Sequence, residues 1–561
     1  MFKKTANKSQ IGMFSHPNFF LSDRSERFYE ENGSWHNLFM KQVTLRVEES
    51  LFEPLYSKET GSPNASVRTM VAMMILKEAN RWSDSQLFEQ CRFNLLIRRA
   101  LGLLNMDDPI PSESTYYLFR KRIVEHERQG NPNLLEETFT AVTKGQAQEF
   151  QVSGRSIRMD SKLLGSNIAW LSRYELVHET LRLFCSKTAF AELVDALTLS
   201  ELELVKSLLS ETGNKVVYRC SGEEVKIRLI DLGILAYRLL SVFEGSSKEQ
   251  YATLSQLFEE QFEVSDQKTI IPKPKECISA DSIQSPHDTD CTYRNKDGNQ
   301  VKGYSVNVTE SCDKDGLNLI SGVEVKKADS ADNAFLESSV IRAEEVFGDP
   351  VKKIHADGAY HSVSNQEFVK GKNAEVILSA IQGAKGRYDL EMDENGVLKV
   401  TDLKTDLTIE SLKMKKSGKW RIKTEEHYRY FSGKALAACQ LRKQIEAIPQ
   451  QELNIRNNVE ATIFQLGYHY PNDKTRYRGL SRNKMWANIR CLWVNFVRIV
   501  KYVGQNSRQA ICELQISLSL HPEASFINQF RPLYGKMSPM IINKPNLYSK
   551  LQFLSFPEIR F

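Results

Sequence analysis

The chain has 561 residues, 41% of them hydrophobic and 26% charged, a balance typical of a globular protein with roughly three or four domains. Its net charge of +5 is small, so only local basic patches could attract a polyanion. No apolar run reaches the roughly 18 residues of a membrane span, and the N-terminus lacks the apolar stretch of a secretory signal. The nine cysteines form no Cys-x-x-Cys pair, which argues against a zinc site and for reduced thiols. We therefore expect a cytoplasmic protein with no membrane partner.

The first 150 residues are expected to be mainly helical. Residues 1–66 are interpreted as an N-terminal arm with short helices, and residues 67–150 as an all-helical domain. Ser83 and Gln86 fit a capping box at the start of one of its helices. Basic residues in this domain either contact DNA phosphates or complement the helix dipoles, and the sequence leaves both interpretations open. The candidates for DNA contact are Arg98, Arg99, Arg120 and Lys121.

A short alternating segment at residues 151–167 begins the next domain. Ile157 and Met159 alternate with polar neighbours, which predicts a strand that ends at Asp160. Residues 168–274 are leucine-rich with a helical period, and they are expected to form a helical insertion. We interpret their leucine and isoleucine stripes as core packing.

Strands and helices return in residues 275–385. The alternation in residues 353–356 predicts a half-buried strand that ends at Asp357, followed by a helix from Ser362 or Ser364. A carboxylate at the carboxyl end of a strand lies where open α/β sheets place their chemistry. An Asp-Gly turn with no function is the alternative for this stretch.

Residues 386–433 consist of short alternating runs between turn residues, which predict a small β-rich insertion. A helix from about Asn454 would carry Arg456 and Glu460 on one face, at positions i and i+4. The final segment, residues 511–561, is a proline-punctuated tail in which we identify no chemistry.

The most lopsided segment is residues 473–501, where eight basic residues accompany one acidic residue and aromatic residues lie between them. This composition suits a nucleic-acid backbone, and it also fits an amphipathic helix with aromatic residues inside and arginines outside. We expect both: a helix that packs inward, and a loop before it that contacts DNA through Lys474, Arg476, Arg478, Arg482 and Lys484.

Two aspartates after strands and a glutamate on a late helix resemble the site of bacterial insertion-sequence transposases of the DDE type. The matching motifs are IRMDSKLLGSNI around Asp160, IHADGAYHS around Asp357, and RNNVEATIFQLG with Arg456 and Glu460. The helical N-terminal segments RTMVAMMILKEANRWSDSQLFEQCRFNLLIRRALGL and PSESTYYLFRKRI also resemble the N-terminal domain of these enzymes, as does the later RYRGL.

The resemblance implies an α/β fold with a ribonuclease H-like mixed sheet flanked by helices, a helical insertion, a small β-rich insertion and an all-helical N-terminal domain. The catalytic core would combine residues 151–167, 275–385 and 434–510. It implies that Asp160, Asp357 and Glu460 are catalytic and hold two Mg²⁺ ions, with Mn²⁺ as an alternative, and that Arg456 orients Glu460 or contacts a phosphate. The implied activity is cleavage of element ends and joining of the 3′-hydroxyl to target DNA. The implied partners are element-end and target DNA in a homodimer or larger assembly associated with the bacterial nucleoid.

The chain departs from this pattern at two positions. Many relatives have a tyrosine where this chain has Leu453 and a lysine where it has Gly467, so Lys474 or Arg476 is the candidate to supply that DNA contact. Two other functions stay open: a metal-dependent nuclease without strand transfer, and a catalytically silent protein that binds element ends.

Overall fold

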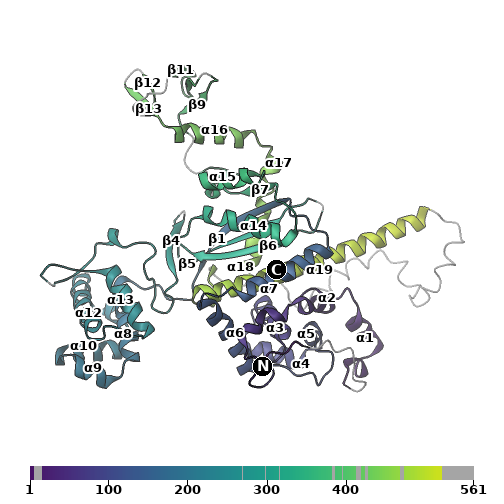
Figure 1. The fold of residues 1–561 in the computed structure, drawn as a ribbon, viewed down its shortest axis with the longest axis horizontal. Helices are drawn as coiled ribbons and strands as arrows, with labels where there is room; N and C mark the ends of the chain where they lie inside the picture. Colours follow the sequence, from purple (N-terminus) through teal and green to yellow (C-terminus); the bar gives the residue numbers. More distant parts are fainter. Residues whose placement is uncertain are drawn as a thin grey trace.

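The computed structural model describes residues 1–5, 15–267, 269–296, 298–314, 316–381, 386–394, 396–411, 418–423, 427–467, 470 and 473–520, with side chains described up to residue 506. Within these ranges the protein is a mixed α/β structure with four groups of elements (Figure 1). They are an N-terminal set of helices, a central sheet with its covering helices, a helical insertion and a β-rich insertion.

The central sheet has six strands in the order β4-β5-β1-β7-β8, with β6 paired to β5. β1 is antiparallel to β5 and parallel to β7, and β7 is parallel to β8, so the sheet is mixed as predicted. The strands are β1 (Ser156–Gly165), β4 (Thr292–Lys296), β5 (Asn299–Ser311), β6 (Ile320–Lys327), β7 (Lys353–Ala356) and β8 (Glu375–Leu378).

Alternation along the strands divides the hydrophobic contacts between the two faces of the sheet. Ile157 and Met159 of β1 pack in one cluster with residues of α14 (Leu336–Phe347) and α15 (Val363–Gly371). Leu164, of opposite parity on β1, belongs to a second cluster with α18 (Asn457–Gly467) and α19 (Leu480–Leu520). The prediction of a helix from Ser362 or Ser364 is confirmed, because Ser362 caps α15.

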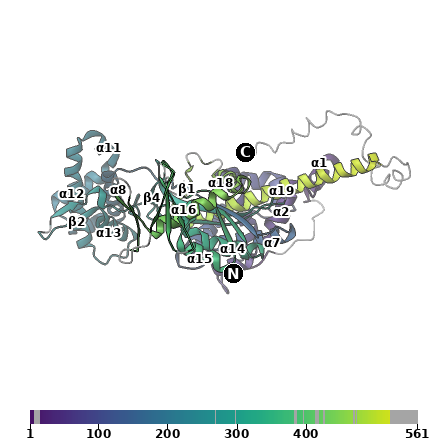
Figure 2. The same ribbon diagram turned by 90° about the horizontal axis from the view of Figure 1, so that it is seen from above.

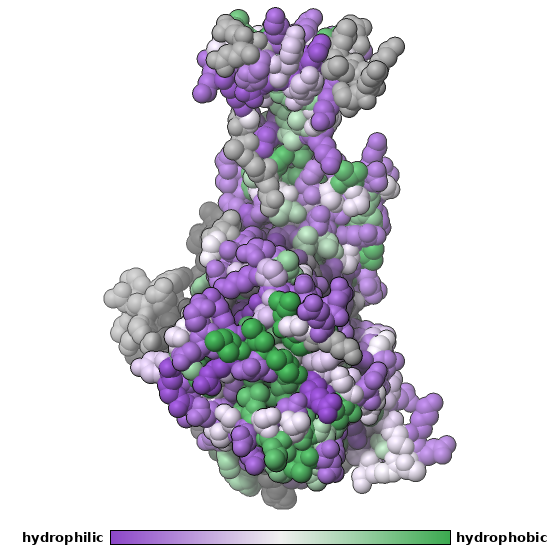
Figure 3. Space-filling view, turned by 90° about the vertical axis from the view of Figure 1, so that its left-hand side faces the viewer, coloured by the Kyte–Doolittle hydropathy of each residue, from purple (hydrophilic) through white to green (hydrophobic). Residues whose placement is uncertain are grey.

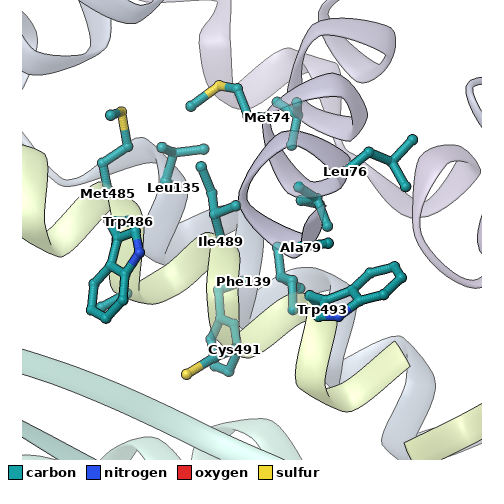
Figure 4. Packing of buried hydrophobic residues seen from close by; sticks show 14 of the residues in the cluster. Met74, Leu76, Ala79, Leu135, Phe139, Met485, Trp486, Ile489, Cys491 and Trp493 are labelled. Atoms are coloured by element: carbon teal, nitrogen blue, oxygen red, sulfur yellow. The ribbon is translucent and has the colours of Figure 1, made fainter. Parts of the chain in front are cut away.

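The N-terminal helices are joined to this second face. Residues of α3, α7 and α19 share one hydrophobic cluster with β5 and β6. Figure 4 shows side chains of the three helices packed together. The predicted capping box of Ser83 and Gln86 is present at the start of α4. The helices are α1 (Asp23–Glu30), α2 (Trp35–Gln42), α3 (Val67–Asn80), α4 (Asp84–Phe93), α5 (Leu95–Ala100), α6 (Glu113–Arg128) and α7 (Leu134–Glu149), with short 3₁₀ helices at Pro17–Phe19, Thr44–Arg46 and Glu49–Leu55.

The helical insertion stands apart from the sheet in both ribbon views (Figures 1 and 2). It has its own hydrophobic cluster, and a small hairpin of β2 (Phe262–Val264) and β3 (Ile270–Pro272) closes it. A Cβ at Gly233 would lie 2.6 Å from the ring of Phe262, so glycine lets this hairpin approach the helix. The helices are α8 (Arg173–Lys187), α9 (Phe190–Ala196), α10 (Leu199–Ser210), α11 (Gly213–Arg219), α12 (Gly222–Val242) and α13 (Glu249–Gln261).

A β-rich insertion follows β8, as predicted. Its strands are β9 (Tyr388–Met392), β10 (Leu398–Asp402), β11 (Leu407–Ser411), β12 (Trp420–Lys423) and β13 (Tyr428–Phe431). The helices α16 (Gly433–Ala447) and α17 (Gln450–Leu453) then return the chain to the sheet. The predicted tail is helical up to Leu520, and the rest of it lies outside the described residues.

Candidate active site

Asp160 lies on β1, and Asp357 immediately follows the adjacent parallel strand β7. The register pairs Arg158 of β1 with His355 of β7, and each aspartate comes two residues after its member of that pair. The prediction that the strand of Asp357 neighbours the strand of Asp160 is therefore confirmed. The prediction that Asp160 ends its strand is wrong, because β1 continues to Gly165 along β5 after its pairing with β7 has stopped.

The Asp160 carboxylate is largely buried and has a cationic partner. Its Oδ2 accepts a hydrogen bond from Arg456 Nη2 at 3.1 Å, and its Oδ1 accepts one from the Ser161 N–H at 2.9 Å. Burial raises the pKa of Asp160 above its usual value, Arg456 opposes this shift, and the nearby Asp357 carboxylate adds to it. The effect of one aspartate on the other indicates that the two carboxylates are neighbours in space.

Glu460 reaches this pair through Arg456. The Arg456 Nη1 atom lies 3.4 Å from Glu460 Oε1, so one guanidinium bridges the glutamate and Asp160. α18 begins at Asn457, so Arg456 precedes the helix rather than lying inside it as predicted. The Glu460 side chain is 60% exposed and that of Asp160 only 13%, so the glutamate faces solvent at the edge of the site.

The donor atoms of this site suit a hard cation. Asp160 and Asp357 offer carboxylate oxygens, the ligands that Mg²⁺ and Mn²⁺ prefer. Arg456 lies between Glu460 and Asp160, and no group of three His, Cys, Asp or Glu side chains in the described ranges is close enough to hold a metal ion. Asp160 and Asp357 thus supply oxygen donors of the right kind, and a metal site formed by the three carboxylates stays a prediction.

A buried carboxylate that the sequence did not reveal lies beneath α18. Glu310 of β5 is completely buried, and its oxygens accept from Arg158 Nε at 2.5 Å and from Thr462 Oγ1 at 2.8 Å. Arg498 of α19 pairs with the same carboxylate at 2.7 Å. Arg158 also donates to the Ile455 carbonyl, so Glu310 ties β1, α18 and α19 together around the segment that carries Arg456 and Glu460.

Two further side chains approach the aspartates. Tyr360 follows Asp357 and donates a hydrogen bond from its hydroxyl to Asn307 Oδ1 of β5 at 2.5 Å. Lys296 Nζ lies 3.4 Å from Asp332 Oδ2, and the lysine's positive charge acts to lower the pKa of Asp160. Tyr360 stands in the matched motif around Asp357, whereas Lys296 stands in no motif and is positioned by the pairing of β4 with β5.

Five of the predicted DNA-binding residues line one groove. The groove has a volume of about 490 Å³ and lies between α6 and the segment that leads into α19. Arg128 also lines it, and sequence reasoning missed this residue. The basic residues of the groove are Arg120, Lys121, Arg128, Arg476, Arg478 and Arg482.

A buried polar network forms the floor beside this groove. Glu78 of α3 accepts from Arg476 Nη2 and from the hydroxyls of Tyr470 and Tyr477, the first at 2.8 Å. Arg490 of α19 donates to the Glu78 carbonyl at 3.0 Å and is itself buried. The prediction that the arginines of this helix lie on its surface is thus wrong for Arg490, because backbone carbonyls of neighbouring segments satisfy its guanidinium.

The other predicted DNA contacts have protein partners. Arg98 is buried and donates to the carbonyls of Asn105, Met106 and Asp108. Arg99 pairs with Glu30, Lys484 pairs with Glu127, and Lys474 Nζ donates to the Ile168 carbonyl. These four residues do not line the groove, whereas the five residues named above do.

Comparison with known proteins identifies the N-terminal region. A family model described as Transposase domain (DUF772) matches residues 29–122, which supports an insertion-sequence transposase. The matched segment runs from the end of α1 into α6 and so contributes one wall of the basic groove. No curated protein matches the chain significantly. No helix in the described ranges is long and apolar enough to cross a membrane.

Proposed function

We propose that the chain is a DDE-type DNA transposase with a ribonuclease H-like core, which cleaves element ends and joins them to target DNA. The observation that supports the proposal is that Asp160 on β1 and Asp357, which immediately follows the parallel neighbouring strand β7, come at the same register, with Arg456 linking Asp160 to Glu460. This arrangement belongs to a chain whose residues 29–122 match a transposase domain.

The proposed reaction has two phosphoryl transfers. In the first, water attacks an element-end phosphodiester, and the bond to the leaving 3′-oxygen breaks to give a free 3′-hydroxyl. In the second, this hydroxyl attacks a target phosphodiester, which forms the joined strand and releases the target's own 3′-hydroxyl. Asp160, Asp357 and Glu460 would hold Mg²⁺, which stabilises the charge on the entering and leaving oxygens. Arg456 would orient Glu460 and, once released from Asp160, contact a phosphate.

The basic groove would hold the DNA on one side of the reacting bond. Strand β1 leads from Asp160 to Gly165, and Asn167 lines the groove. Seven residues of extended chain span about 20 Å, or roughly six nucleotides of duplex. Arg478, Arg482 and Lys121 are exposed there and would contact successive phosphates.

Incubation of the purified protein with labelled element-end DNA, target plasmid and Mg²⁺ tests the proposal. We expect both cut ends and joined products, and Asp357→Ala should abolish both while leaving DNA binding intact. Glu375→Ala is the matched control, because Glu375 is an exposed carboxylate on the adjacent strand β8 and should be silent. Cut ends without joined products would favour a nuclease, and binding without cleavage would favour a silent binding protein. Undiminished joining by Asp357→Ala would overturn the assignment.

A further inference from the structure

The outer face of α12 in the helical insertion carries an exposed apolar stripe, in which Tyr237 also contacts the ring of Phe258. Ile227, Ile230, Ile234 and Tyr237 follow the a/d spacing of a heptad, and all four are exposed, Ile227 by 62% and Ile234 by 48%. The interpretation of the insertion's isoleucines as core is therefore wrong for this helix. Its leucines fill the core instead, through Leu229, Leu232, Leu235 and Leu239.

This stripe lies on a broader apolar surface. Figure 3 shows hydrophobic residues gathered on the lower part of the face that the insertion presents to the viewer. Beside the stripe, Val242 near the end of α12 and Val264 and Ile271 of the adjoining hairpin are exposed by 38%, 43% and 49%. A helix that is apolar on its inner and outer faces has a second surface to bury.

Charges beside the stripe indicate what covers it. Asp231 and Arg238 lie on the same flank, seven residues apart, and both are exposed. Asp231 forms no ion pair within the described ranges, and Arg238 makes one long contact, 3.5 Å from its Nη2 to the Ala196 carbonyl. Opposite charges at e positions of one helix match the same positions of an identical antiparallel helix.

We propose that this face of α12 pairs with the same face of a second copy of the chain, antiparallel and around a two-fold axis near Ile234. In this pairing Ile234 meets its symmetry mate, Ile230 meets the partner copy's tyrosine of the stripe, and Asp231 meets the partner copy's Arg238 twice. The interface is isologous, as closed dimers require. The inference does not depend on the proposed function, because it concerns assembly without DNA.

The dimensions predict a weak interaction. The stripe from Ile227 to Tyr237 is about 15 Å long at 1.5 Å per residue. Two such helices bury less than the roughly 1,200 Å² of a stable interface, so a dissociation constant in the micromolar range is expected.

Sedimentation equilibrium of the full-length protein without DNA tests the proposal. The wild type should shift from monomer to dimer across micromolar concentrations, and Ile234→Asp should weaken the dimer by about a hundredfold or more, because two carboxylates would meet at the axis. Ile341→Asp is the matched control, since Ile341 of α14 is 49% exposed and lies outside the interface. Unchanged circular dichroism for both variants shows that the fold is intact.

A charge exchange tests the orientation of the helices. Asp231→Arg and Arg238→Asp should each weaken the dimer by about tenfold, and the double variant should restore it, because the opposite charges face each other again. A wild type that stays monomeric, a dimer that tolerates Ile234→Asp, or a double variant no better than the single ones would each overturn the proposal.

Discussion

The body formed by the N-terminal helices and the central sheet differs in its packing from the helical insertion. In the body, the N-terminal helices and the central sheet share one hydrophobic cluster, and buried carboxylates at Glu78 and Glu310 bind groups from several segments. The insertion has a separate cluster, and many exposed apolar residues lie on its surface. The family-matched N-terminal region thus shares a hydrophobic core with the sheet that carries the candidate active site, whereas the insertion has a core of its own.

The largest effect on the body is expected from Glu310→Gln. The change leaves Arg158 and Arg498 without a buried counter-charge, which costs about 3–5 kcal/mol. Urea unfolding measures this loss. The control is Glu324→Gln on β6, where a partly exposed carboxylate pairs with Lys326 and should contribute less than about 1 kcal/mol. Equal losses of unfolding free energy for the two variants would contradict the stabilising role assigned to Glu310.

Cavity variants in the two clusters should separate the regions. Leu232→Ala in α12 and Ile489→Ala in α19 each remove a buried side chain, at about 2–4 kcal/mol. Hydrogen exchange followed by mass spectrometry should show faster exchange in α8 to α13 alone for Leu232→Ala. Ile489→Ala should instead affect the N-terminal helices and β6 together. Faster exchange in both regions for either variant would contradict the conclusion that the two regions have separate cores.

Glu78→Gln should have a smaller effect, confined to the contact between α3 and the basic groove. The amide cannot balance Arg476 and serves the two tyrosine hydroxyls less well, so a loss of about 1–3 kcal/mol is expected. Affinity for DNA should fall as the groove wall loosens, which fluorescence anisotropy measures. Glu89→Gln on the exposed surface of α4 is the control. Equal DNA affinity of the two variants would show that the Glu78 network does not support DNA binding.

The smallest expected effect is a pH dependence of the insertion. Burial lowers the pKa of His178 below its usual value of about 6.5, and neighbouring Glu179 opposes the shift. As pH falls through 6.5, the unfolded insertion takes up a proton before the folded one, so its stability decreases. Melting temperatures at pH 7.5 and 5.5 should therefore differ less for His178→Gln than for the wild type. An identical difference would assign the pH dependence to other groups.

Periodicity predicted the elements, and tertiary pairing decided the details. The strand before Asp357 and the helix after it follow from local alternation and a serine cap, and both are present. The length of β1 could not be predicted, because pairing with β5 carries it past Asp160.

The burial of Glu310 and the exposure of the α12 stripe could not be predicted from local sequence patterns. Glu310 stands in an alternating strand where a glutamate usually faces solvent, and only Arg158 and Arg498, far away in sequence, explain its burial. The isoleucines of α12 have the same period as its leucines, so the sequence does not show which set faces the core.

Replacement of each candidate ligand by cysteine tests the active-site proposal most directly. A thiolate binds Mn²⁺ better than Mg²⁺, so activity lost in Mg²⁺ and regained in Mn²⁺ identifies a side chain that contacts the metal ion. We predict this pattern in DNA joining for Asp160→Cys and Asp357→Cys, and for Glu460→Cys once DNA is bound. Glu375→Cys should behave like the wild type in both metals. Full activity of Asp357→Cys in Mg²⁺ would contradict the proposal that these carboxylates form the catalytic centre.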